Sequence, residues 1–163
     1  MAYRAVLGAR AAILRHSFGM GNQANTQRIQ RVILLGVGLF AGWSVSSAWP
    51  QLPPRVASHF NGRGQPDGFM PREAFFTDLA LIGGGLIVLL LLAPALLRLL
   101  PNNLINMPHR DYWLAPERRS ESFGYIAIWF GWFAIATSVL LVAMLNLTLR
   151  ANIAGTGLNA VAA

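Results

Sequence analysis

The sequence predicts an all-α integral membrane protein with three transmembrane helices. Three long apolar stretches, residues 32–49, 79–100 and 123–149, occupy most of its 163 residues. A bilayer core of about 30 Å needs roughly 20 helical residues, and each stretch is near or above that length. Hydrophobic residues make up 55% of the chain and charged residues only 12%, which is too apolar for a soluble domain of this size.

The apolar stretches are expected to be helices and not the strands of a membrane barrel. Barrel strands are about 10 residues long and alternate apolar with polar side chains. Residues 86–92 are continuously aliphatic instead, and residues 126–136 are nearly so. Because backbone amides inside hydrocarbon find no water, an uninterrupted apolar run satisfies its hydrogen bonds as a helix.

The chain is predicted to consist of a basic N-terminal arm, residues 1–29, a membrane domain, residues 30–150, and a short tail, residues 151–163. Two interpretations of the arm stay open: a disordered segment, or sequence that precedes a true translation start at Met20. The loops between the spans are too short to build cores of their own, so we expect them to pack on the spans.

The arginines predict the orientation in the membrane. All thirteen basic residues are arginine, and with the N-terminus in the cytoplasm nine of them fall on the cytoplasmic side and four outside. The positive-inside rule favours this arrangement. We therefore predict a bacterial inner-membrane protein with a cytoplasmic N-terminus and an extracytoplasmic C-terminus. The charge of +7 is thus explained by membrane topology, and no nucleic acid partner is expected.

The first span carries Gly38 and Gly42 at GxxxG spacing, and Ser46 continues this face. Small residues at this spacing let another helix approach closely. Packing against the other spans and contact with a second copy of the chain, or with another subunit, both fit the pattern. In the second span, Pro94 predicts a kink near the cytoplasmic end.

The first loop is predicted to be turn-rich and extracytoplasmic. It contains an Asn-Gly pair and an Asp-Gly pair, which supply turn conformations at little energetic cost. Its candidate binding residues are His59, Phe60, Asn61, Gly64, Pro66, Asp67 and Gly68. Pro71 suits the first position of the helix that follows.

The residues that carry chemistry are few. A histidine with nearby carboxylates, such as His59 and Asp67, binds a divalent metal or exchanges protons in some proteins. Their spacing matches no known site, and the chain contains no enzyme motif and no cysteine. We therefore predict no catalytic residue, metal ligand or cofactor. No carboxylate or histidine lies within a span, which disfavours a proton-coupled transporter.

The second loop, residues 101–122, is predicted to fold onto the cytoplasmic membrane surface before the third span begins. Its candidate binding residues are Asn106, Pro108, Arg110, Asp111, Tyr112 and Trp113. The aromatic residues have apolar bodies with polar edges, which suits the interface. This loop is either a charged surface-docked segment or a contact for a cytosolic protein.

Two segments resemble a known family. Residues 52–62 run Leu-Pro-Pro-Arg-Val-Ala-Ser-His-Phe-Asn-Gly, and residues 64–69 run Gly-Gln-Pro-Asp-Gly-Phe. This pattern resembles the signature of the membrane family called domain of unknown function 1648. Residues 106–117 are similar to the inner-loop segment of many members, and the likeness covers roughly residues 30–150.

The resemblance implies a multi-pass helical protein of the bacterial cytoplasmic membrane with the His-Phe-Asn segment outside. One relative with this domain is a bacillus immunity protein, which protects its host from a secreted killing peptide and recruits a transcriptional repressor to the membrane. Short family members commonly continue into a fourth span beyond the position that matches Arg150, where this chain has residues 151–163.

Three functional hypotheses follow. The preferred one is an immunity-type or signalling-type membrane protein whose first loop binds a peptide or protein partner. The first alternative is a membrane-interface, metal-dependent enzyme that uses His59 and Asp67. The second is a small subunit of a membrane complex, assembled through Gly38 and Gly42.

Overall fold

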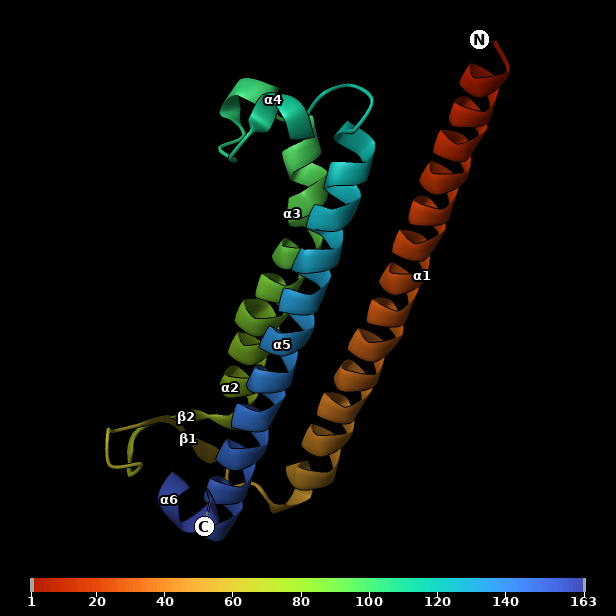
Figure 1. Ribbon diagram of the computed structural model, residues 1–163. Helices are drawn as coiled ribbons and strands as arrows, with labels where there is room; N and C mark the ends of the chain where they lie inside the picture. Colours follow the sequence, from red (N-terminus) through yellow and green to blue (C-terminus); the bar gives the residue numbers. More distant parts are fainter. Residues whose placement is uncertain (1, 163) are drawn as a thin grey trace. The chain divides into compact units, whose positions relative to one another are not determined.

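The computed structural model describes residues 2–162, and it describes side chains for residues 21–158, 160 and 161 (Figure 1). Three helical segments are long and apolar enough to cross a membrane: Gly21–Gln51, Arg72–Leu99 and Arg119–Ala154. The predicted spans 32–49 and 123–149 lie inside two of these segments, and the predicted span 79–100 lies inside the third except for its last residue. The prediction of three membrane helices is thus confirmed.

The helices have the following bounds. In chain order they are α1 (Ala2–Ala48), the 3-10 turn η1 (Trp49–Gln51), α2 (Arg72–Asp78), the π-helical segment η2 (Leu79–Gly84), α3 (Gly85–Leu99), the 3-10 turn η3 (Asn102–Leu104), α4 (Arg110–Trp113), α5 (Arg119–Ala154) and α6 (Leu158–Ala162). Between η1 and α2 lie two strands, β1 (Arg55–Phe60) and β2 (Pro66–Pro71), which the sequence analysis did not anticipate.

One local prediction differs from the structure by a single residue. Pro71 lies at the N-cap of α2 and ends β2, so the helix begins one residue later than predicted. Pro94 is buried inside α3, which continues through it, and the kink expected there stays a prediction. The side chains of residues 1–20 lie outside the described part, so both interpretations of the N-terminal arm stay predictions.

The chain divides into two compact units. Unit 1 contains residues up to Val32 together with Leu90–Phe133, and unit 2 contains Ile33–Leu89 together with the residues from Ala134 onward.

In unit 1, α1 and α5 are joined by buried glutamines. Gln23 Nε2 donates to the Glu121 carbonyl at 3.3 Å, and Gln30 Nε2 donates to the Ile128 carbonyl at 2.8 Å. The donors are separated by the same number of residues as the acceptors, so these helices run parallel in unit 1.

The second loop, residues 101–122, lies in unit 1 and has a small apolar cluster. Ile105, Leu114 and Phe123 are buried together, with Leu97, Met107 and Ile126 packed against them. Ser122 Oγ donates to the Trp113 carbonyl at 2.7 Å, and Asn102 Nδ2 donates to the Leu114 carbonyl at 3.2 Å. These contacts hold the loop against the start of α5.

The core of unit 2 lies where the first loop meets the helices. Its buried residues are Ala48, Leu52, Val56, Leu145 and Leu149, and Phe75, Phe76 and Leu79 pack against them. The two strands form one antiparallel sheet, and they lie near α6 and the last turns of α5 (Figure 1). The first loop is therefore a β-hairpin anchored on the core of this unit.

Candidate functional site

The hairpin has an irregular register centred on His59. Ala57 pairs with Phe69, His59 with Gly68, and Phe60 with Pro66, so that Ser58 on β1 and Asp67 on β2 have no partner opposite them. Such bulges bend a strand and change the direction of its side chains. Here the two irregularities lie on either side of the His59–Gly68 pair, and they bring His59 next to Asp67.

His59 and Asp67 form an exposed pair. The Asp67 carboxylate Oδ1 accepts a hydrogen bond from His59 Nδ1 at 2.5 Å. The side chains are 73% and 44% exposed, so both groups remain accessible to a partner. The carboxylate orients the ring and leaves its Nε2 available for a further hydrogen bond.

The turn of the hairpin is organised by Asn61. Its side-chain Oδ1 accepts hydrogen bonds from the backbone N–H groups of Arg63, at 2.9 Å, and Gln65, at 3.1 Å. Gly64 has φ of 72°, a left-handed conformation that glycine adopts without a steric penalty. Asn61 and Gly64, both predicted as binding residues, thus build the turn that presents the pair.

The end of α5 holds the hairpin in place. Asn152 Oδ1 accepts from the Ala57 backbone N–H at 2.6 Å, and Asn152 Nδ2 donates to the Ala57 carbonyl at 3.1 Å. The side-chain amide therefore satisfies both backbone groups of a buried strand residue, as a neighbouring strand would do. In addition, the Leu158 N–H donates to the Gly64 carbonyl at 2.8 Å. Sequence analysis did not identify Asn152, because its partner is 95 residues away.

Two further hairpin residues that sequence analysis did not select complete the accessible surface. Phe69 is 55% exposed, and Arg55 is exposed, with its Nη2 donating to the Phe69 carbonyl at 3.0 Å. The predicted Phe60 and Pro66 form the last pair of the hairpin and are half-buried. The surface thus combines an aromatic ring, a guanidinium group and the His59–Asp67 pair.

The hairpin places few potential metal ligands close together. Among the described residues, no group of three or more histidine, cysteine, aspartate or glutamate side chains is placed to hold a metal ion. The pair of His59 and Asp67 supplies two such groups. Structural zinc sites in proteins generally use four protein ligands, and catalytic zinc sites use three.

The predicted residues of the second loop lie in unit 1. Arg110 donates to the Asn103 carbonyl at 3.3 Å and lies 3.6 Å from Asp111, while the Tyr112 and Trp113 rings meet edge to face. Tyr112 and Trp113 are exposed, and Asn106 and Pro108 are in the segment before α4. His109 precedes α4 with a left-handed φ of 51°. This loop is a second accessible surface.

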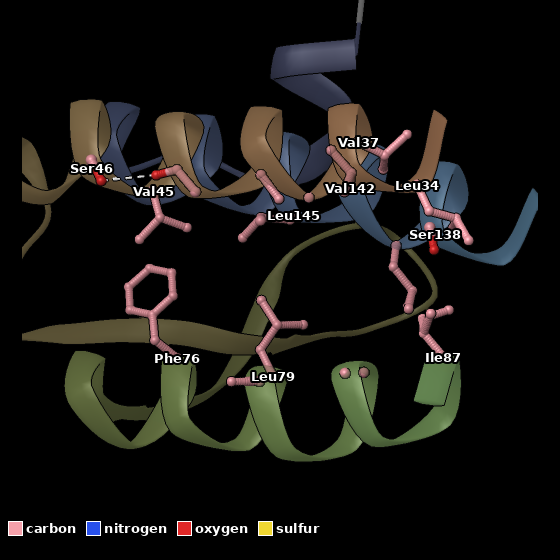
Figure 2. Close-up of a pocket in the computed structure, with 17 residues that line it drawn as sticks. Leu34, Val37, Val45, Ser46, Phe76, Leu79, Ile87, Ser138, Val142 and Leu145 are labelled. Atoms are coloured by element: carbon pink, nitrogen blue, oxygen red, sulfur yellow. Dashed lines mark hydrogen bonds between the residues drawn. The ribbon is translucent and has the colours of Figure 1, made fainter. Parts of the chain in front are cut away.

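A third feature is an apolar cavity inside unit 2. Its volume is about 600 Å³, and Gly38, Ala41 and Gly42 line it from α1. Leu34, Val37 and Val45 of α1 also line it, together with Phe76, Leu79 and Ile87, and with Ser138, Val142 and Leu145 of α5. Figure 2 shows the Val45 side chain pointing toward Phe76. A side chain added at Gly38 or Gly42 would meet nothing within 4 Å, so the GxxxG face is not packed against another helix.

Comparison with known proteins gives a family match but no individual relative. Residues 35–82 match the family model described as "Domain of unknown function (DUF1648)". The matched segment includes the end of α1, the whole hairpin and α2. No curated protein and no solved structure matches the chain. The family model matched by residues 35–82 is thus the one that the His-Phe-Asn segment and its following glycines resemble.

Proposed function

We propose that this membrane protein binds a peptide or protein partner through its hairpin, as an immunity-type or signalling-type component. The observation that carries the proposal is the ordered, accessible His59–Asp67 pair, held 2.5 Å apart at a double register irregularity. A binding site that is already ordered loses less conformational entropy when its partner arrives.

The chemistry of the hairpin indicates which kind of partner it would accept. The Phe69 ring offers an apolar contact, the Asp67 carboxylate accepts hydrogen bonds from cations or amides, and His59 Nε2 bonds to polar groups. An extended polypeptide provides all three complementary groups. The anchoring by Asn152 and Leu158 keeps this surface in one position relative to the rest of unit 2.

A survival assay tests the proposal. The wild-type chain is produced in a sensitive bacterial host that is then exposed to a panel of membrane-active peptides. We expect protection against at least one peptide, and we expect His59→Ala and Phe69→Ala to abolish it. The control is Glu117→Ala, since this side chain is exposed on the other loop and is not one of the candidate binding residues. Equal killing with and without the wild-type chain across the panel would exclude an immunity function.

A second candidate function is that of a subunit in a larger membrane complex. The apolar cavity lined by Gly38 and Gly42 supports it, because these glycines would allow close approach of a helix that no segment of unit 2 supplies. The test is the native mass of the protein in mild detergent, together with Gly42→Ile. An assembly that the wild type forms and Gly42→Ile loses supports this function, and a monomeric wild type contradicts it.

A further inference from the structure

Positive charge is concentrated in unit 1. The described part of this unit, residues 21–32 and 90–133, has twice as many arginines as acidic residues. The arginines are Arg28, Arg31, Arg98, Arg110, Arg118 and Arg119, and the acidic residues are Asp111, Glu117 and Glu121. Unit 2 is close to balanced, with four arginines and three acidic residues.

Two of these guanidinium groups share one aromatic ring. The guanidinium carbon of Arg119 lies 4.9 Å from the centre of the Phe123 ring, and that of Arg98 lies 5.6 Å from the same centre. Phe123 is almost completely buried, so the ring is a fixed support. Cation–π contact holds both cations near it. Both guanidinium carbons thus lie close to one ring at the start of α5.

Neither cation is neutralised within the described part of the chain. Arg119 donates from Nε to Asn102 Oδ1 at 3.2 Å, and from Nη2 to the carbonyls of Arg98, at 3.0 Å, and Leu100, at 3.3 Å. No hydrogen bond or ion pair of the described residues occupies its Nη1 or the Arg98 guanidinium group. Glu117 and Glu121 lie two residues before and two residues after Arg119 in the sequence. Neither glutamate forms an ion pair with Arg98 or Arg119 in the described part of the chain.

The two arginines lie at span ends. Arg98 is next to the last residue of the candidate span Arg72–Leu99, and Arg119 is the first residue of Arg119–Ala154. Charged residues at such positions lie at the depth of the lipid headgroups. Exposed apolar side chains surround the same region, among them Leu99, Leu104 and Trp113. Cationic groups beside apolar ones match the boundary between lipid phosphates and acyl chains.

We propose that Arg98 and Arg119 together bind the phosphate of an anionic phospholipid headgroup. Planar guanidinium groups match phosphate oxygens geometrically, and anionic lipids attract arginines near the membrane surface. Arg119 is held in position by the carbonyls of Arg98, in the last turn of α3, and of Leu100, just after it. Arg98 is exposed, and its guanidinium group has no hydrogen bond to a described residue. This site is independent of the function proposed for the hairpin.

Native mass spectrometry of the purified full chain in detergent provides the test. Dioleoylphosphatidylglycerol and dioleoylphosphatidylcholine are titrated separately, and the dissociation constant of the first bound lipid is measured for each. We expect the wild type to prefer the anionic lipid. Arg98→Gln should weaken phosphatidylglycerol binding about fivefold, the effect of losing one arginine near anionic lipid, and should leave phosphatidylcholine binding unchanged.

Controls separate the proposal from its alternatives. Arg150→Gln removes an exposed arginine at the other end of α5 and should bind both lipids like the wild type. Arg98→Lys keeps the charge without the fork and should give an intermediate affinity, while circular dichroism verifies helicity in every variant. The proposal is overturned if wild type binds the two lipids equally, if Arg98→Gln binds like Arg150→Gln, or if inorganic phosphate alone displaces the anionic lipid at equal concentration.

Discussion

Gly68 lies opposite His59 in the hairpin, and its missing side chain leaves the space that His59 uses. A Cβ atom placed on Gly68 would lie 2.9 Å from His59 Cβ, closer than real Cβ atoms approach. The Asp-Gly pair thus has two roles at the residue scale. Asp67 provides the carboxylate that bonds to His59, and Gly68 leaves room for the His59 Cβ atom.

Gly68→Ala is therefore expected to destabilise the hairpin by about 1–3 kcal/mol, the usual range for overpacking. The histidine must move, so the variant should also lose any protection that depends on the His59–Asp67 pair. Thermal unfolding in detergent, followed by circular dichroism, measures the first effect. Gly62→Ala is the matched control, because a Cβ there meets nothing within 4 Å and should change stability little. Equal melting temperatures for the two variants would contradict the steric argument.

At the scale of elements, helices are joined by side-chain amides that bond to backbone groups. Gln30 is only 3% exposed, and it donates to the Ile128 carbonyl at 2.8 Å next to Gly131. A Cβ on Gly131 would overlap the Gln30 amide, and a Cβ on Gly124 would overlap the Gln23 amide in the same way. Each glutamine on α1 thus fits against a glycine on α5, which sets the register of the two helices in unit 1.

Gln30→Ala should cost about 0.6–1.7 kcal/mol, the range for polar contacts between membrane helices. Gly131→Ala should cost about 1–3 kcal/mol through overlap with the amide. The double variant should be no less stable than Gln30→Ala alone, because removing the amide also removes the overlap. Thermal unfolding of the three proteins in the same detergent checks this, with Gly36→Ala as the control that has open space around it. Additive losses in the double variant would refute the pairing.

The hairpin and α5 are connected by Asn152, and removing this amide is predicted to release the strand. Asn152→Ala leaves the buried N–H and carbonyl of Ala57 without partners, at an expected cost of about 1–3 kcal/mol. Hydrogen exchange of the hairpin amides should then become faster. In the control Asn146→Ala, the lost amide bonds only to Val142 in its own helix, so hairpin exchange should match the wild type. Unchanged exchange in Asn152→Ala would disprove the connection.

At the scale of the whole molecule, the predicted topology gives the two loops different compartments. The chain contains no cysteine, so single cysteines can report accessibility without further engineering. We expect Gly62→Cys to react with a membrane-impermeant maleimide in intact cells, and Asn103→Cys to react only after the membrane is permeabilised. A permeant maleimide that labels both variants is the control. The opposite pattern would reverse the orientation predicted from the arginines.

Local composition accounts for the parts of the fold that the sequence predicts. Long apolar runs specify helical membrane spans, since a run without alternating polar residues satisfies its backbone hydrogen bonds in hydrocarbon as a helix. The Asn-Gly pair predicted the turn of the hairpin, but the turn predicted at the Asp-Gly pair was wrong, because Asp67 and Gly68 lie within β2. The segment around both pairs indicated the family that residues 35–82 match. The two strands of the hairpin were not predicted, because three prolines precede β1 and two more lie within β2. In addition, apolar and polar residues do not alternate regularly along either strand.

The sequence by itself determined how many helices are able to cross a membrane and which loop contains the histidine and its carboxylate. Tertiary structure alone decided that Asn152 satisfies Ala57, that glutamines on α1 fit against glycines on α5, and that Arg98 and Arg119 share the Phe123 ring. The physical reason is that hydropathy and turn preference act over neighbouring residues. These contacts depend on the register between distant segments, which is set by packing and is not encoded in any one of them.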